Sequence, residues 1–194
     1  MDLRFTELMQ NAKLIVEDLA MVKAGDEVLV VTDTRIGEYY GAEELFTALI
    51  AAINAAGAEP VIMTIAPRKR AGDELPKLVA ETMKNKTDAV IFTCLSYSSL
   101  HTRANIDARK NGARIMPLPC GGMGKLNDMI YRVLPKTRAE VDEIAELNKR
   151  AGAYFLSGHD LKVTTEKGTD ITMKIGELAA AKYLLMKASA APSR

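Results

Sequence analysis

Cysteine and histidine are scarce in this chain of 194 residues, which contains two of each. Cys94 and Cys120 cannot build a framework of several disulfides or a zinc site with four cysteine ligands. His101 and His159 are too far apart in the sequence to form a pair of metal ligands on one helix. The composition therefore argues against a disulfide-rich secreted domain, and we expect a reducing, cytoplasmic environment.

An excess of charge of either sign is also missing, because 26 Lys and Arg residues balance 25 Asp and Glu residues. A broad basic surface for nucleic acid or anionic lipid is therefore not expected. The longest uncharged apolar run, residues 45–58, has 14 residues, fewer than the roughly 20 that cross a bilayer. The charged residues near the start of the sequence do not suit an export signal, and we expect none. We therefore expect neither nucleic acid nor a membrane as a partner.

The chain does contain a repeated alternation of helix and strand. Uninterrupted apolar runs predict buried strands at residues 28–31 and 89–92. Further strands are expected at residues 60–66 and 113–117, the last of them shorter and nearer an edge of the sheet. Apolar residues three and four positions apart predict helices over residues 5–19, 42–56 and 73–83, with another helix ending near residue 111. Glycine stands before the strands, at Gly25, Gly57 and Gly112. Four strands separated by helices predict a parallel sheet in a three-layer, Rossmann-like α/β domain.

The pattern changes at Thr137, which forms a Thr-x-x-Glu capping box with Glu140 at the start of a long helix. Beyond that helix, residues 161–165 and 170–175 alternate apolar with polar side chains around a turn, which predicts an antiparallel hairpin. We interpret this hairpin as the first strands of a second, truncated domain. The expected bounds are residues 1–157 for the Rossmann-like domain, 158–176 for the start of the second, and 177–194 for a divergent tail.

In open α/β sheets, ligands bind beyond the carboxyl ends of the strands. The segments that follow the predicted strands are residues 32–35, 64–68, 96–102 and 117–125. We expect five residues of these segments to lie near a substrate: Asp33, Arg35, Ser98, His101 and Cys120. No set of side chains in them predicts a catalytic centre or a metal site within this chain.

Two apparent motifs at these strand ends lack the required spacing. The glycine-rich residues 119–125 do not form a Walker loop, because Pro119 and Leu126 occupy the positions of its glycine and its Ser or Thr. The serines of residues 96–99 could pair with His101, but no Gly-x-Ser-x-Gly sequence marks a nucleophile. The favoured interpretations are a tight glycine turn and a serine loop whose hydroxyl groups cap helices and turns.

Four segments occur in a familiar order: residues 22–34 (VKAGDEVLVVTDT), 56–61 (AGAEPV), 96–105 and 168–172 (GTDIT). Over about residues 1–176, the chain resembles the amino-terminal half of the aminopeptidase T family of metallo-aminopeptidases. The resemblance implies a longer, dimeric two-domain enzyme that acts on peptides. It also implies a pair of divalent ions (Zn, Co or Mn), held by Glu, His and Asp ligands of the carboxyl-terminal domain, which have no counterpart here. The same superfamily includes an iron-dependent dihydroxypyridine dioxygenase, so likeness of fold does not decide the reaction.

The sequence departs from the family after Gly176, where the family continues toward a Gly-x-Cys-x-x-Pro-Gly stretch. With suitable codons, the nucleotides for residues 184–192, read in another frame, encode Thr-Asp-Glu-Gly-Ile-Cys-Arg-Ala-Pro, which is similar to that stretch. We therefore expect an out-of-frame tail over residues 177–194. The alternative is a natural helical ending over residues 178–187.

The resemblance implies a metal-dependent aminopeptidase, of which this chain is the non-catalytic amino-terminal part and carries no metal of its own. One alternative is a non-enzymatic α/β module that binds a small ligand with residues 96–102 and 120–125. Another is a relative of the ring-opening dioxygenase. For the full-length protein, the resemblance implies a homodimer.

Overall fold

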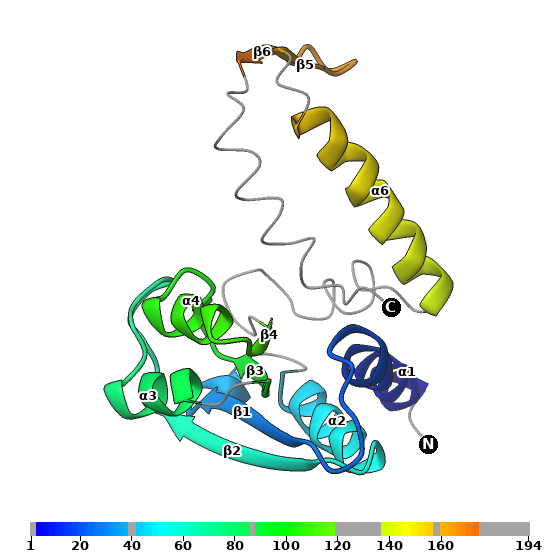
Figure 1. Ribbon diagram of the computed structural model, residues 1–194. Helices are drawn as coiled ribbons and strands as arrows, with labels where there is room; N and C mark the ends of the chain where they lie inside the picture. Colours follow the sequence, from blue (N-terminus) through cyan, green and yellow to red (C-terminus); the bar gives the residue numbers. More distant parts are fainter. Residues whose placement is uncertain (1–2, 39–41, 86–87, 119–136, 157–159, 175–194) are drawn as a thin grey trace. The chain divides into compact units, whose positions relative to one another are not determined.

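The computed structural model describes residues 3–38, 42–85, 88–118, 137–156 and 160–174 (Figure 1). Its internal contacts divide the chain into two units, Met1–Lys136 and Thr137–Arg194, which are described one at a time. The first unit holds a parallel sheet with its helices, and the second holds a helix and a hairpin. The domain bounds expected from the sequence stay a prediction, and the expected boundary near residue 157 lies outside the described residues.

The first unit is built on a four-stranded sheet with the order β2-β1-β3-β4, in which every neighbouring pair is parallel. The strands are β1 (Glu27–Asp33), β2 (Glu59–Ile65), β3 (Val90–Cys94) and β4 (Arg114–Pro117). Helices lie in the connections, so the predicted α/β, Rossmann-like fold class is confirmed. The strands β1 and β3 occupy the centre of the sheet, and β2 and β4 form its edges.

The predicted helical stripes over residues 5–19 and 42–56 agree closely with the helices of this unit. The helices are α1 (Leu3–Lys13), the π-helical η1 (Leu14–Leu19), the short 3-10 helix η2 (Ile36–Glu38), α2 (Ala42–Ala55), α3 (Lys77–Asn85) and α4 (Arg103–Lys110). The prediction that Leu75 belongs to a helix is wrong, because α3 begins after Pro76 and a residue that precedes proline disfavours helical geometry. Among the residues that the structure describes, no helix combines the length and apolar character needed to cross a membrane.

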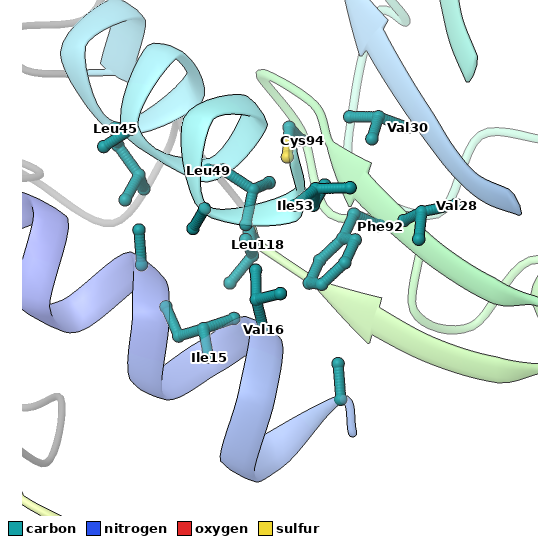
Figure 2. Close-up of a cluster of buried hydrophobic side chains, with 14 of the residues drawn as sticks. Ile15, Val16, Val28, Val30, Leu45, Leu49, Ile53, Phe92, Cys94 and Leu118 are labelled. Carbon is teal, nitrogen blue, oxygen red and sulfur yellow. The ribbon is translucent and has the colours of Figure 1, made fainter. Parts of the chain in front are cut away.

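One face of the sheet packs against α1, η1 and α2 (Figure 1). Figure 2 shows this cluster, in which Phe92 of β3 lies among side chains from the helices, including Val16 of η1 and Ile53 of α2. Phe92 is the largest of the fully buried side chains. Cys94 is a small core residue, since its side chain belongs to the same cluster and is 2% exposed.

The other face of the sheet packs against α3 and α4 through a second apolar cluster. Neighbouring strand residues point to opposite faces, so Val28 and Val30 of β1 enter the first cluster while Leu29 and Val31 enter the second. Both faces of the central strands are therefore buried. This double burial explains why their sequences are uninterrupted apolar runs rather than alternating ones.

The second unit contains α6 (Arg138–Leu156) and an antiparallel hairpin of β5 (Asp160–Thr164) and β6 (Asp170–Lys174). The predicted hairpin is thus confirmed. At the start of α6, the backbone N–H of Glu140 donates a hydrogen bond to Thr137 Oγ1 at 3.2 Å, as the capping box predicts. Leu161 and Val163 of β5 pair with Met173 and Ile171 of β6, which gives the hairpin one apolar face.

Glycine is required where helix exits turn into strands. Gly25 and Gly57 both have positive φ, at 86° and 77°, which side chains with a Cβ atom rarely adopt. The two exits contact each other, because the backbone N–H of Gly25 donates to Gly57 O at 2.8 Å. A Cβ atom on Gly57 would lie 3.0 Å from Ala24 Cβ, so this turn is sterically closed as well as left-handed.

We predict that Gly57→Ala destabilises the chain more than Gly72→Ala does. Both glycines have positive φ, which costs about 1–2 kcal/mol for alanine. A Cβ atom on Gly72 meets nothing within 4 Å, whereas on Gly57 it presses against Ala24. Urea unfolding of the two variants measures the difference, and equal losses of stability would contradict the contribution of the Ala24 contact.

Candidate functional site

The carboxyl ends of β1 and β3 lie side by side at the centre of the sheet. The chain adds β2 on one side of β1 and β3 on the other, so the direction of strand addition reverses between β1 and β3. In open α/β sheets, ligands bind in the crevice at such a switch point. We therefore take Asp33, at the end of β1, and residues 96–102, after β3, as the candidate site and call them the switch-point site.

Asp33 joins the two halves of the switch-point site. Its Oδ2 accepts hydrogen bonds from the backbone N–H of Ser96 at 2.7 Å and from Ser96 Oγ at 2.6 Å. Its Oδ1 accepts a hydrogen bond from the backbone N–H of Arg35 at 3.0 Å. The side chain lies in the interior, with Asp33 2% exposed. The carboxylate therefore holds the start of the β3–α4 loop in position.

The sequence predicts that β1 ends at Val31 and that Thr32 and Asp33 belong to a loop, and this prediction is wrong. The strand continues because Thr32 pairs with Cys94 of β3 and Asp33 pairs with Ile65 of β2. Backbone pairing, with β2 at both residues and with β3 at Thr32, outweighs the polar character of the two side chains. Ser96 donates hydrogen bonds that satisfy the Asp33 carboxylate.

The rest of the β3–α4 loop is held by its own hydrogen bonds. Thr102 caps α4, because its side chain accepts a hydrogen bond from the backbone N–H of Asn105, and its Oγ1 donates to Ser99 O at 2.8 Å. Asn105 Nδ2 donates to Ser99 O and, at 3.0 Å, to Ser99 Oγ. All three residues are buried. The Ser99 hydroxyl group thus serves the structure of the loop.

The neighbouring β2–α3 segment is tied to this loop. The backbone N–H of Gly72 donates to Ser98 O at 2.9 Å. The carboxylate of Glu74 accepts hydrogen bonds from the backbone N–H of Arg103, at 2.9 and 3.1 Å, at the first residue of α4. A negative side chain at this position complements the helix dipole. The amino terminus of α4, a potential anion-binding position, is therefore occupied by the chain's own Glu74.

The same segment contains an exposed ion pair between Arg70 and Asp73, with 2.9 Å between Arg70 Nε and Asp73 Oδ1. The hydrogen bond from the Arg70 side chain holds the pKa of the Asp73 carboxyl below its ordinary value. Because the folded pKa is lowered, the pair's contribution to stability is present above the ordinary pKa and disappears as the pH falls through the lowered value.

The five predicted site residues have different environments. Asp33 is buried, and it accepts a hydrogen bond from the backbone N–H of Arg35. The Arg35 side chain instead forms an ion pair with Glu38, with 2.9 Å between Arg35 Nε and Glu38 Oε2. His101 is exposed on the β3–α4 loop, and Ser98 is partly buried there. Cys120 lies outside the described residues. The structure therefore brings Asp33 and Arg35 together and presents Ser98 and His101 on one loop.

Sequence reasoning missed two residues that shape this site, Asn105 and Glu74. A Thr-x-x-Asn spacing from Thr102 marks the helix start and could have indicated Asn105, whereas no local pattern connects Glu74 with α4. Some buried polar atoms near the strand ends have no hydrogen-bond partner. These are Thr32 Oγ1, Thr93 Oγ1, Asn105 Oδ1 and Arg68 Nε.

The described residues do not suit the pair of divalent ions that the resemblance implies. Both oxygens of Asp33 accept hydrogen bonds from the chain, and the Glu74 carboxylate accepts them from α4. Within the described ranges, no group of three or more His, Cys, Asp or Glu side chains could hold an ion. The expectation that the metal ligands belong to other polypeptide stays a prediction.

Comparison with known proteins gives a likeness of fold. The solved structures similar to this chain include 2,5-dihydroxypyridine dioxygenase from Pseudomonas putida KT2440, with a TM-score of 0.60, 16% identity and coverage of 89% of this chain and 48% of that one. They also include wild-type AmpT from Thermus thermophilus, with a TM-score of 0.45, 17% identity and coverage of 87% and 53%. This chain thus spans about half the length of both. No protein-family profile and no curated protein matches the sequence.

We predict that Asp33→Asn lowers the free energy of unfolding by about 1–3 kcal/mol, because an amide cannot accept all the hydrogen bonds that the buried carboxylate accepts. Ser96→Ala removes the hydroxyl group but keeps the backbone hydrogen bond, so its expected loss is smaller, about 1 kcal/mol. Asp142→Asn makes the same chemical change on an exposed helix position and serves as the control. Urea unfolding gives all three values, and an Asp33→Asn loss no larger than the control's would contradict the role of Asp33.

A second prediction concerns Asp73. Arg70→Gln should raise the pKa of the Asp73 carboxyl, because it removes the charged hydrogen-bond donor. Lys69→Gln is the matched control, since the hydrogen bond from Lys69 to Asp73 comes from the backbone of Lys69, not from its side chain. Titration of the Asp73 carboxyl carbon by NMR measures both, and an unchanged pKa in Arg70→Gln would rule out the ion pair as the cause.

Proposed function

We propose that this chain is the non-catalytic amino-terminal part of a metal-dependent aminopeptidase. The observation that carries the proposal is the hydrogen bonding of the Asp33 carboxylate, which is used within the chain to shape the switch-point site. A carboxylate so engaged positions a loop and has little capacity left to ligate an ion or move a proton. In this proposal, catalysis belongs to polypeptide outside the described unit.

Two features of the switch-point site favour an auxiliary role for this chain in substrate binding. The β3–α4 loop is rigidly held by Asp33 and Asn105, while His101 at its surface is exposed. A fixed backbone with accessible polar side chains is suited to contact a substrate that another domain holds. The peptide is the proposed substrate, and the metal ions (Zn, Co or Mn) belong to the complete enzyme.

Two other functions are each favoured by one observation. The fold likeness to 2,5-dihydroxypyridine dioxygenase extends over 89% of this chain, which keeps a related ring-opening enzyme as a candidate. The unpartnered Asn105 Oδ1, in a fully buried residue beside the loop, favours a module that binds a small ligand with hydrogen-bond donors.

The test measures binding and turnover by the 194-residue chain. We expect a dipeptide with a free amino terminus to shift the backbone NMR signals of Ser98 and His101, and its N-acetylated form to shift them less. Leucyl-p-nitroanilide with added Zn²⁺ or Co²⁺ should be hydrolysed no faster than in the protein-free blank. Chelator-sensitive hydrolysis above the blank would contradict the non-catalytic role.

Variants and alternative ligands separate the candidate functions. His101→Ala should abolish the dipeptide-induced shifts, whereas Lys149→Ala, an exposed change on α6, should not. Shifts with 2,5-dihydroxypyridine and none with the dipeptide would favour the dioxygenase relative. Shifts only with other metabolites, in the absence of metal, would favour the small-ligand module.

A further inference from the structure

The outer edge of β2 is uncovered within the part of the chain that the structure describes. β2 ends the sheet on one side, with β1 as its hydrogen-bonded neighbour. Its adjacent residues Val61 and Ile62 are 44% and 47% exposed, and they point to opposite faces of the strand. An edge strand with apolar side chains on both faces is a template for pairing with another strand.

The backbone of β2 presents alternate residues to this edge. Glu59 and Ile65, its first and last residues, make backbone hydrogen bonds on the β1 side at 2.8 and 3.1 Å. In a parallel ladder, the N–H and C=O groups of one residue point to the same neighbouring strand. The intervening alternate residues Pro60, Ile62 and Thr64 therefore direct their backbone groups outward. Proline lacks an N–H group and is tolerated at this kind of edge position.

Two copies of this edge are complementary in one antiparallel register, with Ile62 opposite Thr64 of the second copy. Each of these residues then donates its N–H group to the other's C=O group. Pro60 faces Ala66 of the second copy, whose N–H group reaches Pro60 O. The missing N–H of Pro60 leaves no acceptor unpaired, because Ala66 O already accepts a hydrogen bond from Arg68 Nη2 at 3.0 Å. With Ile62 opposite itself, Pro60 would instead leave Thr64 O without a donor.

The charges along β2 favour the same antiparallel arrangement. Glu59, at the start of the strand, is exposed, and the exposed Lys69 follows its end. Antiparallel pairing brings the start of one strand to the end of the other, so opposite charges approach each other at both ends. A parallel pair would bring like charges together.

A shallow groove beside the edge is lined by Ile62 together with Phe46, Ile50 and Ala51 of α2. A strand added to β2 would cover Ile62 and the adjoining side of this groove. We propose that β2 pairs antiparallel with β2 of a second copy of this chain, which joins the two sheets into one across a twofold axis. The second copy is the occupant because the backbone pattern and the charges of this edge are both self-complementary.

Disulfide trapping tests the register. In the proposed pair, Met63 faces its own counterpart as a non-hydrogen-bonded pair, with Cα atoms about 4.5 Å apart, within the range of a disulfide. The Cα atom of Val61 would lie about 14 Å from its counterpart. In a Cys120→Ser background, Met63→Cys should form a covalent dimer under mild oxidation, and Val61→Cys should not. Equal cross-linking of the two variants overturns the proposal.

Sedimentation of the full chain over a dilution series tests the pairing itself. Thr64→Pro removes the outward N–H group of residue 64 in each copy, so the dimer loses two hydrogen bonds. Dimerisation should weaken by about tenfold or more. Thr64→Val keeps that N–H group and should leave dimerisation unchanged, which makes it the matched control. The proposal is overturned if the wild-type chain stays monomeric over the whole dilution series, even if it binds an added extended peptide. Equal dimerisation of the two variants also overturns it.

Discussion

The hydrogen bonds between Asp33 and Ser96 connect two strand ends that are 63 residues apart in the sequence. They fix the position at which the chain leaves β3, and the conformation of the rest of the β3–α4 loop depends on that position. Ser99, Thr102 and Asn105 are joined by hydrogen bonds. The Glu74 carboxylate accepts a hydrogen bond from the first residue of α4. A buried carboxylate is stable there because donors from the chain replace the water that it loses.

This arrangement fixes the backbone at the carboxyl ends of β1 and β3 and, among the residues that the structure describes there, leaves few free ligand groups. Two acidic side chains beside the β3–α4 loop, Asp33 and Glu74, are engaged in holding it. His101 remains exposed on the same loop. A rigid loop with an accessible side chain fits a domain that contributes contacts to a site completed elsewhere, which is the basis of the proposed function.

The apolar patterns were sufficient to predict most of the fold. Uninterrupted runs identified the central strands because both of their faces are buried, and helical stripes identified α1, α2 and α3. The errors occurred where local signals compete with tertiary contacts. Thr32 and Asp33 look like loop residues by polarity, yet pairing with β2, and at Thr32 also with β3, keeps them in β1. Leu75 has the spacing of a helical stripe, yet Pro76 delays the start of α3.

The sequence by itself determined the order of strands and helices along the chain, the glycine turns and the hairpin, because propensity, periodicity and turn chemistry act over a few residues. Only the tertiary structure decided that β2 is an edge, that Asp33 meets Ser96, and that Glu74 reaches α4. These contacts join residues that are distant in sequence. Their free energies depend on burial and on donor geometry that arise when the two apolar clusters form on either side of the sheet.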